Sequence, residues 1–149
     1  MYREESLQEE ERRLLGALCN FKDEGLIQKT LAMALSDEVR SQDSVIVIIR
    51  ALGNRHGREQ AWQYIQDNWK ELVKRYGDGH SLSYIPSSLG SVFAREEDAS
   101  RVETFFAKNP VKSIERTVKQ CLENIRLQAD WYERDHEKLA RYLETTKLS

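Results

Sequence analysis

The chain has 149 residues, of which 40% are hydrophobic and 32% are charged, and its formal net charge is −2. The sequence contains only seven glycines and two prolines, so its composition is typical of a folded helical domain and excludes a disordered tail or a disulfide scaffold. Acidic and basic residues are mixed along the chain, which excludes the basic stripe that a nucleic-acid-binding protein needs.

The first elements in chain order are predicted to be two neighbouring helices. Ser6 and Glu9 have the spacing of a capping box, and apolar residues then recur at helical spacing until Asn20. Asp23 can cap a second helix, because its side-chain oxygen can accept a hydrogen bond from a backbone N–H of the first turn. A short link between the two helices predicts that they lie antiparallel.

Residues 45–49 are five consecutive apolar residues, most of them β-branched, and by propensity alone they favour a buried strand. Ser41 or Asp43 upstream can cap a helix, however, and Gly53 downstream is typical of a helix end. No second strand is visible to pair with this run, and a lone buried strand would leave its backbone groups without hydrogen bonds. We therefore predict a buried helix over residues 43–52.

The rest of the chain also shows helical periodicity. Its clearest stripe carries two tryptophans, and a stretch further on contains Pro86 and Gly90, which predict a short or kinked helix. Asp135 can cap a last helix. The other predicted helices cover residues 57–77, 81–93, 96–109 and 113–131.

Together these elements predict an all-α fold of about eight helices with no β-sheet. Successive antiparallel helix pairs are the building units of α-solenoids. No repeat is detectable letter by letter, so the repeat would be degenerate. The length suits a single helical domain over residues 1–149.

The sequence offers no motif for catalysis or for metal binding. Its three histidines are distant from one another, and neither H-E-x-x-H nor C-x-x-C occurs. There is no nucleophile elbow and no phosphate-binding loop. Cys19 and Cys121 are predicted to be buried free thiols, which favours a reducing compartment. No apolar run is long enough to span a membrane, and the polar N-terminus does not resemble a secretory signal.

Arg55, His56 and Arg58 cluster just before the tryptophan-bearing helix. They can form a site for an anion such as a carboxylate, because the N-terminal end of a helix is positive. They can equally belong to a solvated loop in which one arginine pairs with a nearby acid. Both interpretations remain open from the sequence.

Three stretches of the chain resemble one family. They are "LSDEVRSQDSVIVI", "GREQAWQYIQDNWKEL" and "ERTVKQCLENIRLQADWYERD", and "FFAKNP" lies between the last two. They are similar to the C-terminal segments of zinc aminopeptidases of the puromycin-sensitive type, a family that includes the endoplasmic-reticulum, insulin-regulated and aminopeptidase N enzymes. The resemblance covers about residues 11–143.

The resemblance implies a non-catalytic role. In that family a separate catalytic domain carries H-E-x-x-H and G-A-M-E-N, and neither motif occurs in this chain. The C-terminal domain is a bowl of HEAT-like helix pairs that caps the active site and encloses the peptide cavity. This chain would be the last part of that bowl, with zinc only in the parent enzyme. Its partners would be the parent's catalytic domain and a peptide substrate, with no nucleic acid and no membrane.

The resemblance implies roles for only a few residues. Basic residues inside the bowl can engage a peptide, which makes the loop residues Arg55, His56 and Arg58 candidates for peptide binding. Residues that match the family pattern would cap or pair helices, and these are Arg40, Gln42 and Asp43. The "VKQCLENI" block and the lack of an obvious disulfide favour the cytoplasmic branch, with a lumenal branch as the alternative.

Two further expectations follow from the sequence. The alternative function is a free-standing helical-repeat adaptor that binds a protein partner and has no enzymatic parent. If the chain instead lacks a preceding helix pair, residues 11–34 should either expose apolar surface or self-associate through it.

Overall fold

The structure is a computed structural model that describes residues 8–77 and 79–146 of the chain. Within these residues it contains eight α-helices, two short 3-10 turns and no strand, so the predicted all-α fold is confirmed. Ser6, half of the expected capping box, lies outside the described residues. The helices are α1 (Gln8–Leu18), α2 (Glu24–Ala34), α3 (Ser41–Gly53), α4 (Arg58–Asp67), α5 (Trp69–Tyr76), α6 (Tyr84–Val92), α7 (Glu96–Lys108) and α8 (Glu115–Thr146), and the 3-10 turns are His80–Ser83 and Lys112–Ile114.

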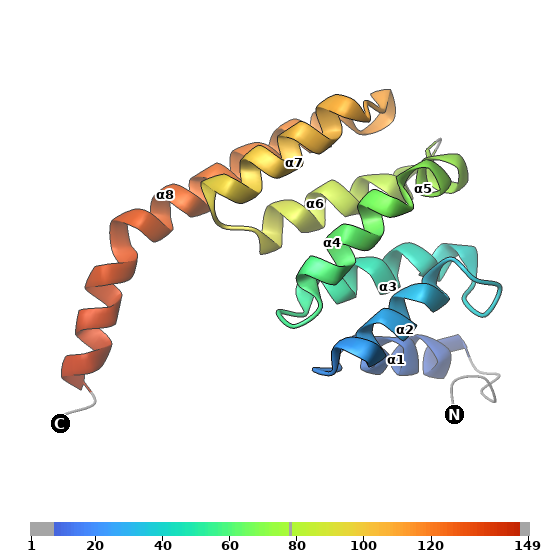
Figure 1. Ribbon diagram of the computed structural model, residues 1–149, viewed down its shortest axis with the longest axis horizontal. Helices are drawn as coiled ribbons and strands as arrows, with labels where there is room; N and C mark the ends of the chain where they lie inside the picture. Colours follow the sequence, from blue (N-terminus) through green and yellow to red (C-terminus); the bar gives the residue numbers. More distant parts are fainter. Residues whose placement is uncertain (1–7, 78, 147–149) are drawn as a thin grey trace.

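The helices follow one another back and forth in antiparallel order (Figure 1). Helix α3 contacts α2, α4 and α6, and α6 in turn contacts α8. Helices α7 and α8 pack side by side at the far end of the stack from α1 (Figure 1). The core is therefore a continuous apolar layer that runs from α1 to the first half of α8.

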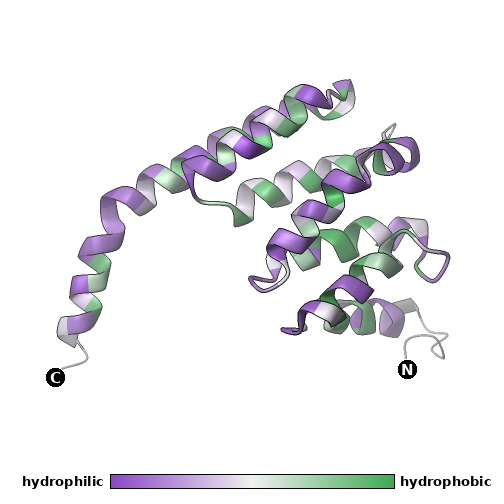
Figure 2. Ribbon diagram, in the orientation of Figure 1, coloured by the Kyte–Doolittle hydropathy of each residue, from purple (hydrophilic) through white to green (hydrophobic). Residues whose placement is uncertain are grey.

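The apolar run of residues 45–49 is part of helix α3, as predicted. Val45, Val47 and Ile48 are at most 1% exposed, because α2, α4 and α6 cover three sides of the helix. Figure 2 shows α3 as strongly hydrophobic, which is the pattern of a helix with neighbours on most sides. The expected side-chain cap is wrong, however. The helix follows Arg40, and no side chain caps its first turn.

The long helix predicted over residues 57–77 is divided into α4 and α5. Asn68 stands at the break, and its side-chain amide donates a hydrogen bond to the carbonyl oxygen of Tyr64 at 2.9 Å. A short amide side chain competes in this way with the helical backbone bonds. Trp62 on α4 and Trp69 on α5 both remain in the core, where each packs edge-on against Phe105 of α7.

The separate last helix that the sequence predicted does not form. Helix α8 runs without interruption over 32 residues, because no glycine or proline occurs within it. Asp135 is not a cap; its carboxylate pairs with Arg134 at 2.8 Å and with Lys138 at 3.7 Å. Figure 1 shows that α8 extends past the other helices and bends toward its C-terminal end.

Exposed apolar side chains lie mainly at the opposite end of the chain from where they were expected. In the first helix pair, Leu15, Ile27 and Leu31 are buried by α3 and by each other, and Leu26 is the large apolar residue that is exposed. Apolar exposure on residues 11–34 is thus limited to Leu26 among the large side chains, and the alternative, self-association through these residues, stays a prediction. The second half of α8 instead exposes Leu127, Trp131, Tyr132, Leu139, Tyr142 and Leu143.

Candidate functional site

The loop between α3 and α4 carries the basic cluster singled out by the sequence. Asn54 holds this loop in place. Its side-chain amide donates to the carbonyl oxygens of Cys19 at 3.0 Å and Phe21 at 2.7 Å, in the turn between α1 and α2. Its side-chain oxygen accepts the backbone N–H of His56 at 3.0 Å. The loop is thus fixed by one amide to the preceding helix pair.

The three basic residues of the loop do not converge on one point. Arg55 and His56 are exposed, and Arg55 Nε lies 3.2 Å from His56 Nε2. Arg58 is half-buried and turns back to α3, where its Nε donates to the carbonyl oxygen of Leu52 at 3.3 Å. Arg58 therefore helps to terminate α3, since a helix leaves its last carbonyl groups without intrahelical partners.

Arg58 also lines a polar cavity of about 360 Å³ between the start of α4 and the start of α7. Three arginines and three carboxylates surround this cavity, so its formal charge is balanced. Phe93 supplies its apolar wall. The charged lining residues are Arg58, Glu59, Arg95, Glu97, Asp98 and Arg101.

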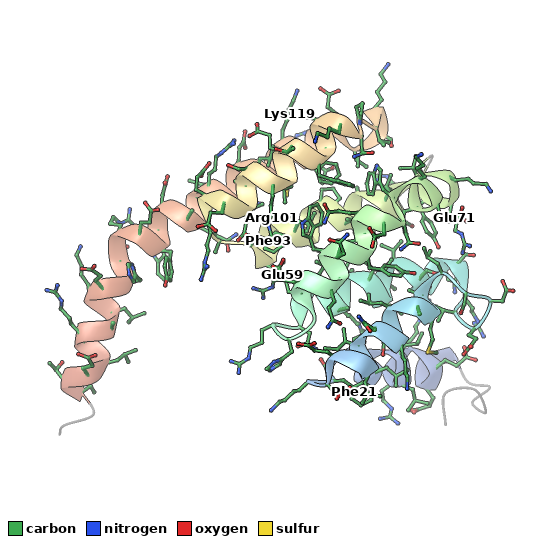
Figure 3. All side chains as sticks on the ribbon, viewed as in Figure 1. Phe21, Glu59, Glu71, Phe93, Arg101 and Lys119 are labelled. Carbon is green, nitrogen blue, oxygen red and sulfur yellow. The ribbon has the colours of Figure 1, made fainter. Side chains whose placement is uncertain are left out.

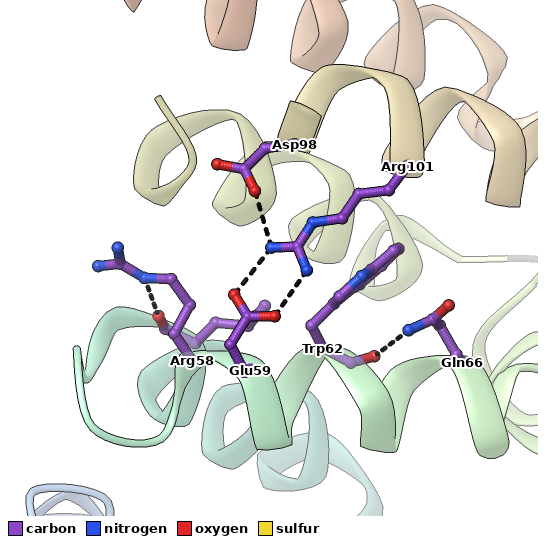
Figure 4. Close-up of polar contacts among 7 residues, drawn as sticks. Arg58, Glu59, Trp62, Gln66, Asp98 and Arg101 are labelled. Atoms are coloured by element: carbon purple, nitrogen blue, oxygen red, sulfur yellow. Dashed lines mark hydrogen bonds and ion pairs between the residues drawn. The ribbon is translucent and has the colours of Figure 1, made fainter. Parts of the chain in front are cut away.

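Arg101 is the centre of this cavity. Its guanidinium makes two hydrogen bonds to the carboxylate of Glu59, at 2.6 and 2.8 Å, and pairs with Asp98 at 2.8 Å (Figure 4). It also lies over the ring of Phe93, with 4.5 Å between the guanidinium carbon and the ring centroid. Figure 3 shows these side chains meeting between α4 and α7. The contact joins two helices that are 42 residues apart in sequence at this point.

The electrostatics of the cavity follow from this contact. The hydrogen bond from Arg101 lowers the pKa of Glu59 below its ordinary value, and the same bond raises the pKa of Arg101. Both terminal nitrogens of Arg101 are engaged with Glu59 and Asp98, whereas its Nε is buried without a hydrogen-bond partner. Arg58 and Arg95 make no ion pair with any residue that the structure describes, and they are the groups of this cavity able to bind a carboxylate.

The residues predicted to cap or pair helices lie between α1 and α3. Arg40 pairs with Glu11 at 3.0 Å, and Asp43, which is 5% exposed, accepts a hydrogen bond from Arg12 Nε at 3.0 Å. Gln42 is exposed. Two charged pairs thus connect α1 to the start of α3.

Residues 8–77 and 79–146 contain no cluster of metal-binding side chains. No three His, Cys, Asp or Glu side chains of this part of the chain lie close enough to hold a metal ion. Cys19 and Cys121 are buried free thiols, and burial raises their pKa values to about 11 and about 12. None of the described helices combines the length and the apolar character that crossing a bilayer requires.

The sequence did not indicate the roles of Glu59 and Arg101. Both lie among other charged residues on exposed helical faces, where a charged side chain is usually only solvated. The one available signal is the position of Glu59 in the first turn of α4, and this says nothing about a partner on α7.

Comparisons with known proteins give one consistent result. A family model described as the ERAP1-like C-terminal domain matches residues 1–127. Aminopeptidase M1 of Arabidopsis thaliana is 37% identical over 133 residues, which are 89% of this chain and 15% of that protein. Alanine/arginine aminopeptidase of Saccharomyces cerevisiae is 32% identical over 91% of this chain and 16% of its own length. Glutamyl aminopeptidase of Bitis rhinoceros is 30% identical over 99% of this chain and 16% of its own length. The chain therefore spans about one sixth of the length of the relatives that it matches.

Proposed function

The chain belongs to the family of ERAP1-like C-terminal domains, and from this membership we propose that it is the non-catalytic C-terminal domain of a zinc metallo-aminopeptidase. It would cap the active site of the parent enzyme and enclose the cavity in which the peptide substrate lies. One observation carries this proposal: relatives named as aminopeptidases match nearly the whole chain with only 15 to 16% of their own length. Most of such a parent lies outside this chain.

The stacked antiparallel helices support a place in the wall of a bowl. Each helix pair packs on the next, so the stack can curve around a cavity, as HEAT-like arrays do. In this proposal residues 1–149 are one helical domain, the last part of the bowl. The parent would belong to the puromycin-sensitive branch.

Peptide binding within this domain would be weak and electrostatic. Arg58 is the strongest of the loop candidates, because it lies in a cavity and its outer guanidinium nitrogens point away from Glu59 (Figure 4). Arg55 and His56 would add positive charge or hydrogen bonds at the exposed edge of the same loop. A peptide carboxylate is the group that such a loop would recognise.

The chemistry of the parent would be supplied by residues outside this chain. Zinc would be held by the catalytic domain, and this domain would contribute no ligand to it. The two buried free thiols suit a reducing compartment, and we place the parent in the cytoplasm on that ground.

Two measurements test the proposal. Purified chain with added zinc, assayed on an aminoacyl fluorogenic substrate, should release no more product than buffer. The reading frame upstream of Met1 should encode H-E-x-x-H and G-A-M-E-N. Chelator-sensitive turnover that stays with the chain through purification would contradict the non-catalytic role. An upstream frame without both motifs would favour the free-standing adaptor.

The capping role has its own test. The upstream part of the parent should be expressed alone and together with this chain, and both preparations assayed on a dipeptide and on a longer peptide. The chain should change the ratio of the two turnover rates, because it would limit access to the active site. An unchanged ratio in a stable complex would contradict the role.

A further inference from the structure

A small cavity of about 40 Å³ lies between helices α1 and α3. Three charged groups line it: the guanidinium groups of Arg12 and Arg50 and the carboxylate of Asp43. The rest of its lining consists of Leu15, Gly16, Ile46 and Val47. About 10–15 Å³ is the least volume that admits one water molecule, so this cavity can hold a small ion and excludes larger ligands.

The charges of the cavity do not balance. Asp43 is 5% exposed and accepts a hydrogen bond from Arg12 Nε at 3.0 Å, so Arg12 neutralises this carboxylate. The guanidinium of Arg50 makes neither an ion pair nor a hydrogen bond with any residue that the structure describes. One positive charge is therefore left without a counter-ion, and a guanidinium directs its N–H donors toward carboxylates and other anions.

Gly16 allows Arg50 to lie beside the cavity. Glycine is less favourable than alanine inside a helix, and Gly16 lies inside α1. A Cβ atom at this position would overlap a terminal nitrogen of Arg50 and lie 3.1 Å from its guanidinium carbon. The guanidinium thus occupies the space that any other side chain at position 16 would fill. Arg50 as a whole is exposed, so the cavity is accessible to an ion from solvent at this residue.

We propose that this cavity is a binding site for one small monovalent anion, with Arg50 and Arg12 as its donors. Arg12 uses its Nε for Asp43, which leaves its terminal nitrogens for the anion. Chloride and the carboxylate of a short organic acid share the required size and charge. An anion held by both arginines would connect α1 to α3 and would therefore stabilise the fold. This proposal does not depend on the proposed function.

Thermal unfolding of the full chain in different sodium salts tests the site. Chloride and formate fit the cavity, whereas gluconate, the reference anion, is too large to enter it. Chloride or formate should raise the melting temperature above its value in gluconate at equal concentration, because the ion binds only the folded state. With a dissociation constant of about 20 mM, about 200 mM of the ion gives a rise of about 3–6 °C. A rise with chloride alone identifies a halide site, and a rise with formate alone identifies a carboxylate site.

Three variants test the assignment to the cavity. Arg50→Gln should raise the dissociation constant at least about tenfold and so lose most of the melting-temperature rise, because the unpaired charge is gone. Gly16→Ala keeps every charge but displaces the guanidinium, and it should lose the rise although alanine favours helix α1. Arg55→Gln removes the same charge from an exposed arginine outside the cavity, and this matched control should keep the rise.

The outcomes separate a bound anion from a general effect of salt. An equal rise in the wild type and all three variants would show a general salt effect only and would overturn the proposal, as would no rise in the wild type. A rise kept in Gly16→Ala and lost in Arg50→Gln would overturn the cavity as its origin. Broadening of the chloride NMR signal by the native wild type, with less broadening by Arg50→Gln, measures chloride binding without unfolding the protein.

Discussion

Gly90 offers the sharpest test of how closely α6 and α8 approach each other. A Cβ atom at Gly90 would lie 3.0 Å from Cα and 3.3 Å from the carbonyl oxygen of Cys121. Both of these atoms are backbone, so no side-chain rotation can relieve the contact. Gln128 strengthens the approach, because its side-chain amide donates to the carbonyl oxygen of Gly90 at 2.7 Å. Helices α6 and α8 would have to separate by a few tenths of an ångström to admit a methyl group.

The magnitude follows from two opposing effects. Gly90→Ala gains up to about 1 kcal/mol of helix propensity and loses about 1–3 kcal/mol through overpacking. The net change lies between zero and about 3 kcal/mol of lost stability. For a chain of this length each kcal/mol lowers the melting temperature by about 2–4 °C. Gly90→Val adds two more methyl groups at the same point and should lose more.

Gly53 supplies the matched control. It is also a helical glycine, at the end of α3, and no heavy atom lies within 4 Å of the position its Cβ would take. Gly53→Ala should therefore be neutral or should raise the melting temperature. The measurement is the melting temperature of Gly90→Ala, Gly90→Val and Gly53→Ala, each compared with that of the wild type. The reasoning is refuted if Gly90→Ala stabilises the protein as much as Gly53→Ala does.

Two other predictions concern titration and reactivity. Arg101 lowers the pKa of Glu59 in the folded protein, so the Arg101–Glu59 pair stabilises the fold at pH values above the ordinary carboxyl pKa of 4.5. This stabilisation is lost as the pH falls through the lowered pKa that Glu59 has in the folded protein. The wild type should thus be more stable than Glu59→Gln at pH 7, by less than about 1 kcal/mol because Glu59 is 67% exposed. This difference should shrink as the pH falls below 4.5, and a difference that does not change with pH would contradict the pairing. Cys19 and Cys121 should react with a thiol reagent at pH 8 only after denaturation, because burial raises their pKa values, and rapid labelling of the native protein would contradict their burial.

The sequence predicted the elements whose determinants are local. Helix α3 could be recognised despite its strand-like composition, because its length and the glycine at its end were visible in the chain. The break at Asn68 was missed, since asparagine within a helical pattern is common and its bond to Tyr64 depends on the local geometry. The continuity of α8 was missed because Asp135 resembles a cap when its partners Arg134 and Lys138 are not considered.

The candidate site was less predictable than the fold. The sequence indicated Arg58 because it lies beside Arg55 and His56, yet the structure separates it from them and places it with residues of α7. Periodicity shows which residues of one helix share a face, and it gives no information on which side chains of another helix they meet. Arg101 could therefore be assigned to Glu59 only from the folded chain.

Helix α8 is packed against other helices in its first half only, and this affects how the helix forms and how its end unfolds. Its first half, which includes Cys121 and Ile125, is held by packing, whereas residues 130–146 are bordered mainly by solvent. An isolated helix of about 17 residues is only marginally stable in water, because starting the first turn is unfavourable. The packed half removes this difficulty by acting as a nucleus from which the remaining turns propagate. Amide hydrogens should accordingly exchange fastest at Thr146 and progressively more slowly toward Ala129, so that one unbroken helix contains a gradient of fraying.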